Sequence, residues 1–178
     1  MQQDMKLVIT ALGGGAPMPI SELLHIIRES EGKLLECRIS SMGAISAAYL
    51  FVEGNWHKIA KLENMLESFG NRHHLALHFK RDETDIDELK QLPYTIDVIS
   101  ADRIGLADEL AKFFLERDMT ILDLTANRYS AVRTELPLVS IRLIIGIPLS
   151  HRIISLRDEF LDYCDEFNLD AVMEPVKP

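Results

Sequence analysis

The chain has 178 residues, of which 47% are hydrophobic and 26% charged, and its formal net charge is −9. This length admits one large or two small domains, and about two-thirds of the unfolded surface can be buried on folding. The acidic balance argues against direct binding of nucleic acid, because proteins that neutralise phosphates need clustered Lys and Arg side chains. No run approaches the roughly 20 apolar residues of a membrane span, and the first residues lack the pattern of a signal peptide. We therefore expect a cytoplasmic protein.

The first half of the chain predicts six elements from its hydrophobic periodicity. Apolar runs and period-two alternation indicate strands, whereas apolar residues spaced by three and four indicate helices. Only Met42 and Gly43 break the pattern between the second and third strands, and so short a break requires an antiparallel hairpin. The predicted order is strand, helix, strand, strand, helix and strand, at residues 6–12, 19–31, 33–40, 44–52, 55–69 and 75–79.

Several side chains of this half receive individual predictions. Alternation in the second strand places Leu35, Cys37 and Ile39 on one face. Cys37 and Cys164 lie far apart in apolar segments, so we expect packed, reduced thiols rather than a disulfide. Asn55 is expected to cap the second helix. The apolar stripe of that helix comprises Trp56, Ile59, Leu62, Leu66 and Phe69.

The same order restarts after Pro93. Its elements are expected at residues 94–100, 105–116, 120–128, 138–147, 150–167 and 169–173. The repeat predicts an α+β chain of two ferredoxin-like βαββαβ domains, each with an antiparallel four-stranded sheet and both helices on one face. Residues 1–80 should form the first domain and residues 93–178 the second. The charged residues 81–92 between them indicate a linker or a short exposed helical turn.

The second copy is longer than the first. Aligning Gly15 with Asp102 requires a shift of 87 residues, whereas aligning Leu62 with Phe160 requires a shift of 98, a difference of 11. The added residues are expected at the tip of the second hairpin, residues 129–137, because hairpin tips accept extra length at a small entropic cost.

The loop between the first strand and the first helix of each copy is the candidate binding site. Bare amides at a helix start attract anions, but the loop at Gly13-Gly14-Gly15 lacks the glycine and lysine spacing of phosphate-binding loops. In the second copy, Asp102 can cap the helix and Gly105 lets the backbone approach a neighbour closely. Two interpretations stay open for the second loop: a capped structural turn, or a site for the charged groups of a small zwitterion.

Other features do not predict catalysis or metal binding. His74 and His78 share one face of the expected strand but would lie about 13 Å apart, too far to ligate one ion. No Ser, Cys or Lys lies in a nucleophile motif, and no carboxylate pair is placed for acid–base chemistry, so we expect no enzyme, metal or cofactor. An acylphosphatase-like enzyme is the weakest alternative, because the first loop lacks an arginine-and-amide cradle.

The loop Asp102-Arg103-Ile104-Gly105-Leu106, followed by a helix, a hairpin and a second helix, resembles the ACT domain, a ligand-binding regulatory module. With residues 7–13, Gly54-Asn55-Trp56 and the tandem length, the chain resembles the glycine cleavage system transcriptional repressor family. This resemblance implies an amino-acid sensor, with glycine as the expected ligand, that binds a transcriptional activator protein rather than DNA. It also implies a homodimer through ACT–ACT pairing, which unpaired sheet edges favour.

The resemblance places a retained site in the second copy. Its residues would be Asp102, Arg103, Ile104, Gly105 and Leu106, with Thr120 and Ile121 as further lining residues. In the first copy Gly15-Ala16-Pro17-Met18 replaces the family's Asp-Arg-Pro-Gly, so the altered loop would comprise Gly13, Gly14, Gly15 and Met18. A Met18 side chain can fill that pocket, and a ligand-independent interaction module with decayed ACT sites therefore remains the alternative function. Gly105→Asp is expected to abolish ligand binding with little change in melting temperature.

Overall fold

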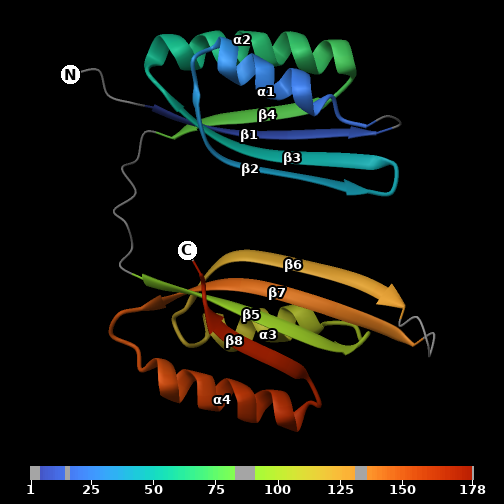
Figure 1. Cartoon of the computed structure of the whole chain (residues 1–178), viewed down its shortest axis with the longest axis vertical. Helices are drawn as coiled ribbons and strands as arrows, with labels where there is room; N and C mark the ends of the chain where they lie inside the picture. The colour runs from blue at the N-terminus through green and yellow to red at the C-terminus, as the bar shows by residue number, and fades with distance from the viewer. Residues whose placement is uncertain (1–4, 15–16, 83–90, 131–135, 178) are drawn as a thin grey trace. The chain divides into compact units, whose positions relative to one another are not determined.

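The chain divides into two compact units, Met1–Asp85 (unit 1) and Ile86–Pro178 (unit 2). The computed structural model describes residues 5–14, 17–82, 91–130 and 136–177. Each unit contains a four-stranded antiparallel sheet with two helices on one face (Figure 1). The predicted α+β fold of two ferredoxin-like βαββαβ domains is confirmed. Most of the predicted linker falls on residues 83–90, which lie outside the described residues.

Unit 1 contains four strands in the order β2-β3-β1-β4. Its elements are β1 (Met5–Gly14), α1 (Ile20–Glu29), β2 (Lys33–Met42), β3 (Ile45–Gly54), α2 (Trp56–His73) and β4 (Ala76–Asp82). The central strands β1 and β3 alternate buried and exposed residues, and Ile9 pairs with Leu50 in the core. The predicted cap of α2 is confirmed, since Asn55 Oδ1 accepts a hydrogen bond of 3.0 Å from the Lys58 amide.

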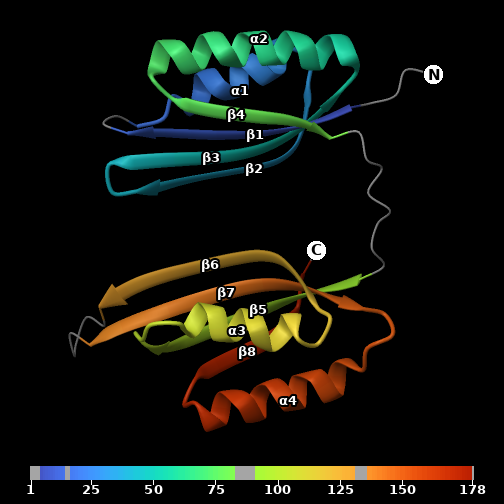
Figure 2. The same cartoon turned by 180° about the vertical axis from the view of Figure 1, so that it is seen from behind.

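Unit 2 repeats this plan with strands in the order β6-β7-β5-β8. Its elements are β5 (Gln91–Ala101), α3 (Leu106–Leu115), β6 (Thr120–Ser130), β7 (Pro137–Pro148), α4 (Ile153–Glu166) and β8 (Asp170–Pro175). Figure 2 shows α3 and α4 on the same side of this sheet. Phe113, Phe114 and Phe160 pack their rings together beneath them, with centroid separations of 5.1 to 5.5 Å. Each unit therefore has its own hydrophobic core.

The extra length of unit 2 is divided between the β6–β7 hairpin and the connection that precedes α4. The prediction placed all of it at the hairpin tip, of which residues 131–135 lie outside the described residues. In unit 1, however, only Asn55 separates β3 from α2, whereas residues 149–152 separate β7 from α4. Part of the insertion thus lies before the second helix. That connection is also a surface turn, closed by the His151 amide on the Pro148 carbonyl, so it accepts length as a hairpin tip does.

The predicted burial of β2 was partly wrong. Cys37 pairs with the buried Leu50, so it is on the helix-covered side as predicted, but its side chain is exposed. A β-bulge between Leu34 and Glu36 displaces Leu35 from the expected alternation. Both errors arise because β2 is an edge strand, which no further strand and little helical surface covers. Cys164 is buried as expected, and both thiols are free.

Two residues at the ends of α2, Trp56 of the expected apolar stripe and His74, are also placed differently. Trp56 is 53% exposed because it is the first residue of α2, and its ring lies 5.8 Å from the guanidinium carbon of Arg81. His74 is not in a strand; it ends α2 in the left-handed conformation at φ 53°, and β4 begins only at Ala76. The premise that His74 and His78 share a strand face is therefore wrong.

No helix in the described parts of the chain is long and apolar enough to cross a membrane.

Candidate functional site

The loop between β5 and α3 makes a sharp turn at Gly105. This residue precedes α3 with φ +89°, in the left-handed region that glycine adopts without a steric penalty. Among the residues that the structure describes, no side chain accepts a hydrogen bond from the first-turn amides of α3. The first amides of a helix have no partner within the helix and carry its positive dipole end, so this turn can bind a carboxylate.

Asp102 does not cap α3, contrary to the prediction. Its carboxylate forms an ion pair with Arg128 of β6, with Oδ1 and Nε 3.1 Å apart, and its amide donates to the Pro137 carbonyl at 2.9 Å. The helix begins at Leu106, so the capping position falls on Gly105 and Asp102 lies too early in the chain to reach the first-turn amides. Asp102 instead attaches the loop to the β6–β7 hairpin.

Arg103 and Glu109 form a clamp across the turn. Two hydrogen bonds join them, from Arg103 Nη1 at 2.8 Å and Nη2 at 2.6 Å to the two oxygens of Glu109. These hydrogen bonds lower the pKa of Glu109 and raise the pKa of Arg103, because each charge stabilises the other. A side chain built on Gly105 would place its Cβ 3.8 Å from Glu109 Oε1, so the clamp lies beside the turn. A ligand carboxylate could compete with Glu109 for this guanidinium.

The remaining predicted residues of the second copy are not all brought together. Ile104 is 94% exposed, whereas Leu106 is buried in the core. Thr120 and Ile121 start β6 at the other end of the sheet. Thr120 pairs with Gly146 of β7, and Gly146 pairs in turn with Pro93 of β5. Pro93 precedes Ala101, the last residue of β5, by eight residues. At about 3.3 Å per residue this separates them from Asp102 by roughly 26 Å.

Thr120 has a local role of its own. Its Oγ1 accepts a hydrogen bond of 3.0 Å from Gln91 Nε2, and the Gln91 side chain lies over Gly146, where an added Cβ would come within 2.0 Å of Gln91 Oε1. Within one unit, Thr120 and Ile121 therefore do not line the same pocket as the loop at Gly105.

In unit 1 the corresponding loop is differently built. Gly13 and Gly14 belong to β1 and pair with Ser46 and Ile45, and Gly15 lies outside the described residues. An added Cβ at Gly13 would meet Leu75 at 2.3 Å, so close packing explains the glycine. Met18 is 6% exposed and belongs to the core of unit 1.

Sequence reasoning missed Glu109 and Arg128. Glu109 lies in the first turn of α3, where acidic side chains are favoured by the helix dipole, so its position beside Arg103 carried a local signal. Arg128 carried none, because its contact with Asp102 depends on the register of β6.

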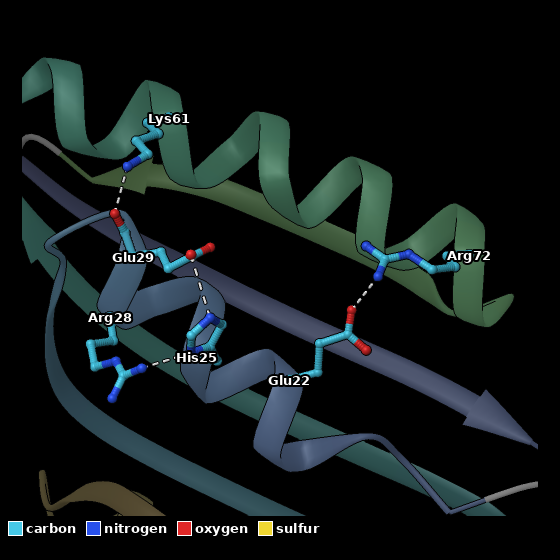
Figure 3. Close-up of polar contacts among 6 residues, drawn as sticks. All are labelled: Glu22, His25, Arg28, Glu29, Lys61 and Arg72. Carbon is cyan, nitrogen blue, oxygen red and sulfur yellow. Dashed lines mark hydrogen bonds and ion pairs between the residues drawn. The ribbon is translucent and has the colours of Figure 1, made fainter.

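The helix-covered face of each unit also carries a groove between its helices. In unit 1 Glu22 of α1 accepts a hydrogen bond from Arg72 of α2 at 2.5 Å and contacts His73 at 2.7 Å. Lys61 of α2 donates to the carbonyl of Glu29 at 2.6 Å. Figure 3 shows the Glu22–Arg72 and Glu29–Lys61 contacts joining the two helices. Figure 3 also shows His25 between Glu29 and Arg28 on α1. Among the described residues, no group of three or more His, Cys, Asp or Glu side chains could hold a metal ion.

Residues 5–80 match the family model of the ACT domain. A crystal structure of a candidate glycine cleavage system transcriptional repressor has 21% sequence identity, covers 98% of this chain and 99% of that one, and superposes with a TM-score of 0.71. A protein from Galdieria sulphuraria described as unknown has 13% identity, the same coverage and a TM-score of 0.72. No curated protein sequence matches the chain. The match to the ACT-domain model therefore lies within unit 1, and unit 2 repeats the same ferredoxin-like fold.

Proposed function

We propose that the protein is a regulator that senses a small amino acid, with glycine as the first ligand to test, and acts by binding a transcriptional activator. The observation that carries this proposal is the similarity over 98% of the chain to the candidate glycine cleavage repressor, together with the match to the ACT-domain model at residues 5–80. The net charge of −9 supports binding to a protein rather than to DNA.

The proposed ligand site is the turn at residues 102–105 of unit 2. The uncapped first turn of α3 offers backbone amides to a carboxylate, and Gly105 leaves the space beside them open. Arg103 offers a second contact for the same carboxylate if it is released from Glu109. The charge of Glu109 then remains nearby to attract the ligand's ammonium group. In this proposal Asp102 and Arg128 hold the loop in place and do not touch the ligand.

The ligand-independent interaction module remains the second candidate, because two observations favour it. Met18 belongs to the core of unit 1, where it replaces the family's glycine, and Arg103 already has a full bidentate partner. A ligand must displace that ion pair, so the measured affinity will be lower than the contacts alone would provide.

Titration calorimetry with glycine tests the sensor proposal. Serine and alanine serve as larger amino acids, and glycinamide serves as a matched compound that keeps the ammonium group but lacks the carboxylate. We expect heat with glycine and none with glycinamide. The absence of heat with every amino acid would refute the sensor and leave the interaction module.

A further inference from the structure

The groove between α3 and α4 of unit 2 is lined by aromatic and acidic side chains. Its volume is about 580 Å³, and its two aromatic lining residues, Phe113 and Tyr163, have ring centroids 5.0 Å apart. Burial raises the pKa of Tyr163, so this side chain stays a neutral phenol at physiological pH. We call this groove the α3–α4 groove. Its charged lining residues are Glu109, Lys112, Glu116, Arg117, Glu159, Asp162 and Glu166.

Carboxylates outnumber cations in the α3–α4 groove by five to two. Both cations are already paired, Lys112 with Asp108 at 2.7 Å and Arg117 with Glu159 at 3.1 Å. Across the described ranges, no hydrogen bond or ion pair involves the side chain of Asp162 or Glu166, which lie one helical turn apart on α4. The groove therefore has negative charge that its own cations do not neutralise.

Arg117 shows which chemistry this groove accommodates. Its guanidinium lies 3.8 Å from the centroid of the Phe113 ring, pairs with Glu159, and donates a hydrogen bond of 2.8 Å to the Phe113 carbonyl. Stacking on an aromatic face combined with a carboxylate is a favoured environment for arginine. Tyr163 lines the same groove as the carboxylates of Asp162 and Glu166. The half-exposed Phe167, which is not one of the lining residues, extends this aromatic surface, with its ring centroid 4.8 Å from that of Tyr163.

The groove between α1 and α2 of unit 1 lacks both features. It has a similar volume of about 490 Å³, but its apolar residues are Ile26 and Met65. Its carboxylates are paired within the unit: Glu22 with Arg72 and Glu29 with His25 (Figure 3), and Glu22 also with His73. Each unit thus has a groove between its two helices, but only the groove of unit 2 has unpaired negative charge among the described residues. This difference makes the surface of unit 2 complementary to a cation.

We propose that the α3–α4 groove docks an arginine-containing basic segment of a protein partner. The inference rests on the protein-binding half of the proposed function. It adds the surface of this chain that binds the partner and the positive charge of the partner's segment. It does not depend on the proposed amino-acid site. Arginine side chains of the segment would stack on Tyr163 and Phe167 and pair with Asp162 and Glu166.

The test is fluorescence anisotropy of the full chain with a fluorescein-labelled, alanine-based helical peptide carrying four arginines. We expect Asp162→Asn with Glu166→Gln to raise Kd by about threefold to tenfold, since each exposed ion pair contributes a modest amount. Asp158→Asn with Asp165→Asn is the matched control: it removes the same charge from exposed positions of α4 outside the groove lining. The control should leave Kd within a factor of two. A lysine peptide of equal charge should bind more weakly, because lysine lacks the planar guanidinium that stacks on rings.

Three results would overturn the proposal. Equal Kd for the wild type and the groove variant would place the peptide elsewhere, and equal weakening by the control would show only general attraction to an acidic protein. Competition by spermidine as effective per charge as the peptide would assign the groove to small polyamines. Glycine calorimetry and peptide anisotropy on the wild-type chain separate the two proposals: glycine heat with no peptide binding refutes the groove alone, whereas peptide binding without glycine heat refutes the sensor alone.

Discussion

Replacing Gly105 with alanine should cost unit 2 stability through the backbone alone. At φ +89° an L-residue loses about 1 to 2 kcal/mol relative to its preferred conformations. The added methyl group meets nothing closer than Glu109 Oε1 at 3.8 Å, which is an ordinary contact, so no steric term adds to this cost. For a domain of this size, each kcal/mol lowers the melting temperature by about 4 to 8 °C. The expectation that Gly105→Asp leaves the melting temperature nearly unchanged therefore does not hold.

Circular dichroism melts and glycine calorimetry on Gly105→Ala and Gly105→Asp separate strain from ligand repulsion. Both variants carry the backbone strain, but only aspartate places a second carboxylate beside the amides that would bind the ligand. We expect Gly105→Ala to melt about 4 to 16 °C lower in unit 2 and still bind glycine, and Gly105→Asp to bind none. Gly14→Ala is the control, because Gly14 has no positive φ and its added Cβ would lie 3.7 Å from the Ala44 carbonyl. Equal glycine affinity of Gly105→Ala and Gly105→Asp would refute the proposed site.

Two further predictions concern the separate cores. Phe160→Ala should destabilise unit 2 by about 3 to 5 kcal/mol, because Phe160 is fully buried in its core. The unfolding transition of unit 1, followed by the fluorescence of Trp56, should not move. A parallel shift of the transitions of both units would contradict independent cores. At pH 8, Ellman's reagent should label the exposed Cys37 alone, because burial raises the pKa of Cys164 to about 11. Since the folded state holds that proton more tightly, the associated stability is full below pH 9.0 and is lost as the pH rises toward about 11. Rapid labelling of two thiols in the native chain would contradict this assignment.

The periodicity of the sequence predicted the fold because buried positions in helices and strands repeat at fixed intervals. Alternation in β3 and β7 and the spacing of Ile59, Leu62 and Leu66 on α2 depend only on neighbours in the chain. The Asn55 cap was predictable for the same reason, since its acceptor and donor lie three residues apart.

The errors fall where a residue's environment depends on a distant segment. Cys37 faces the expected side of its sheet, but only the strand order shows that β2 lies at an edge. Thr120 was placed in the ligand site because it starts the strand after α3, and only the register of β6 reveals that it lies at the opposite end of the sheet from Asp102.

The sequence by itself therefore determined the tandem ferredoxin-like fold and the asymmetry between the first loops of the two copies. It also provided the glycine at position 105, which can adopt a left-handed backbone conformation. Only the tertiary structure decided the partners of the charged side chains. Asp102 pairs with Arg128 of the β6–β7 hairpin, and α4 brings Asp162 and Glu166 to the groove that it shares with α3. Local periodicity specifies which face of an element is buried, whereas ion pairs and grooves form between elements, and no spacing along the chain encodes their distance.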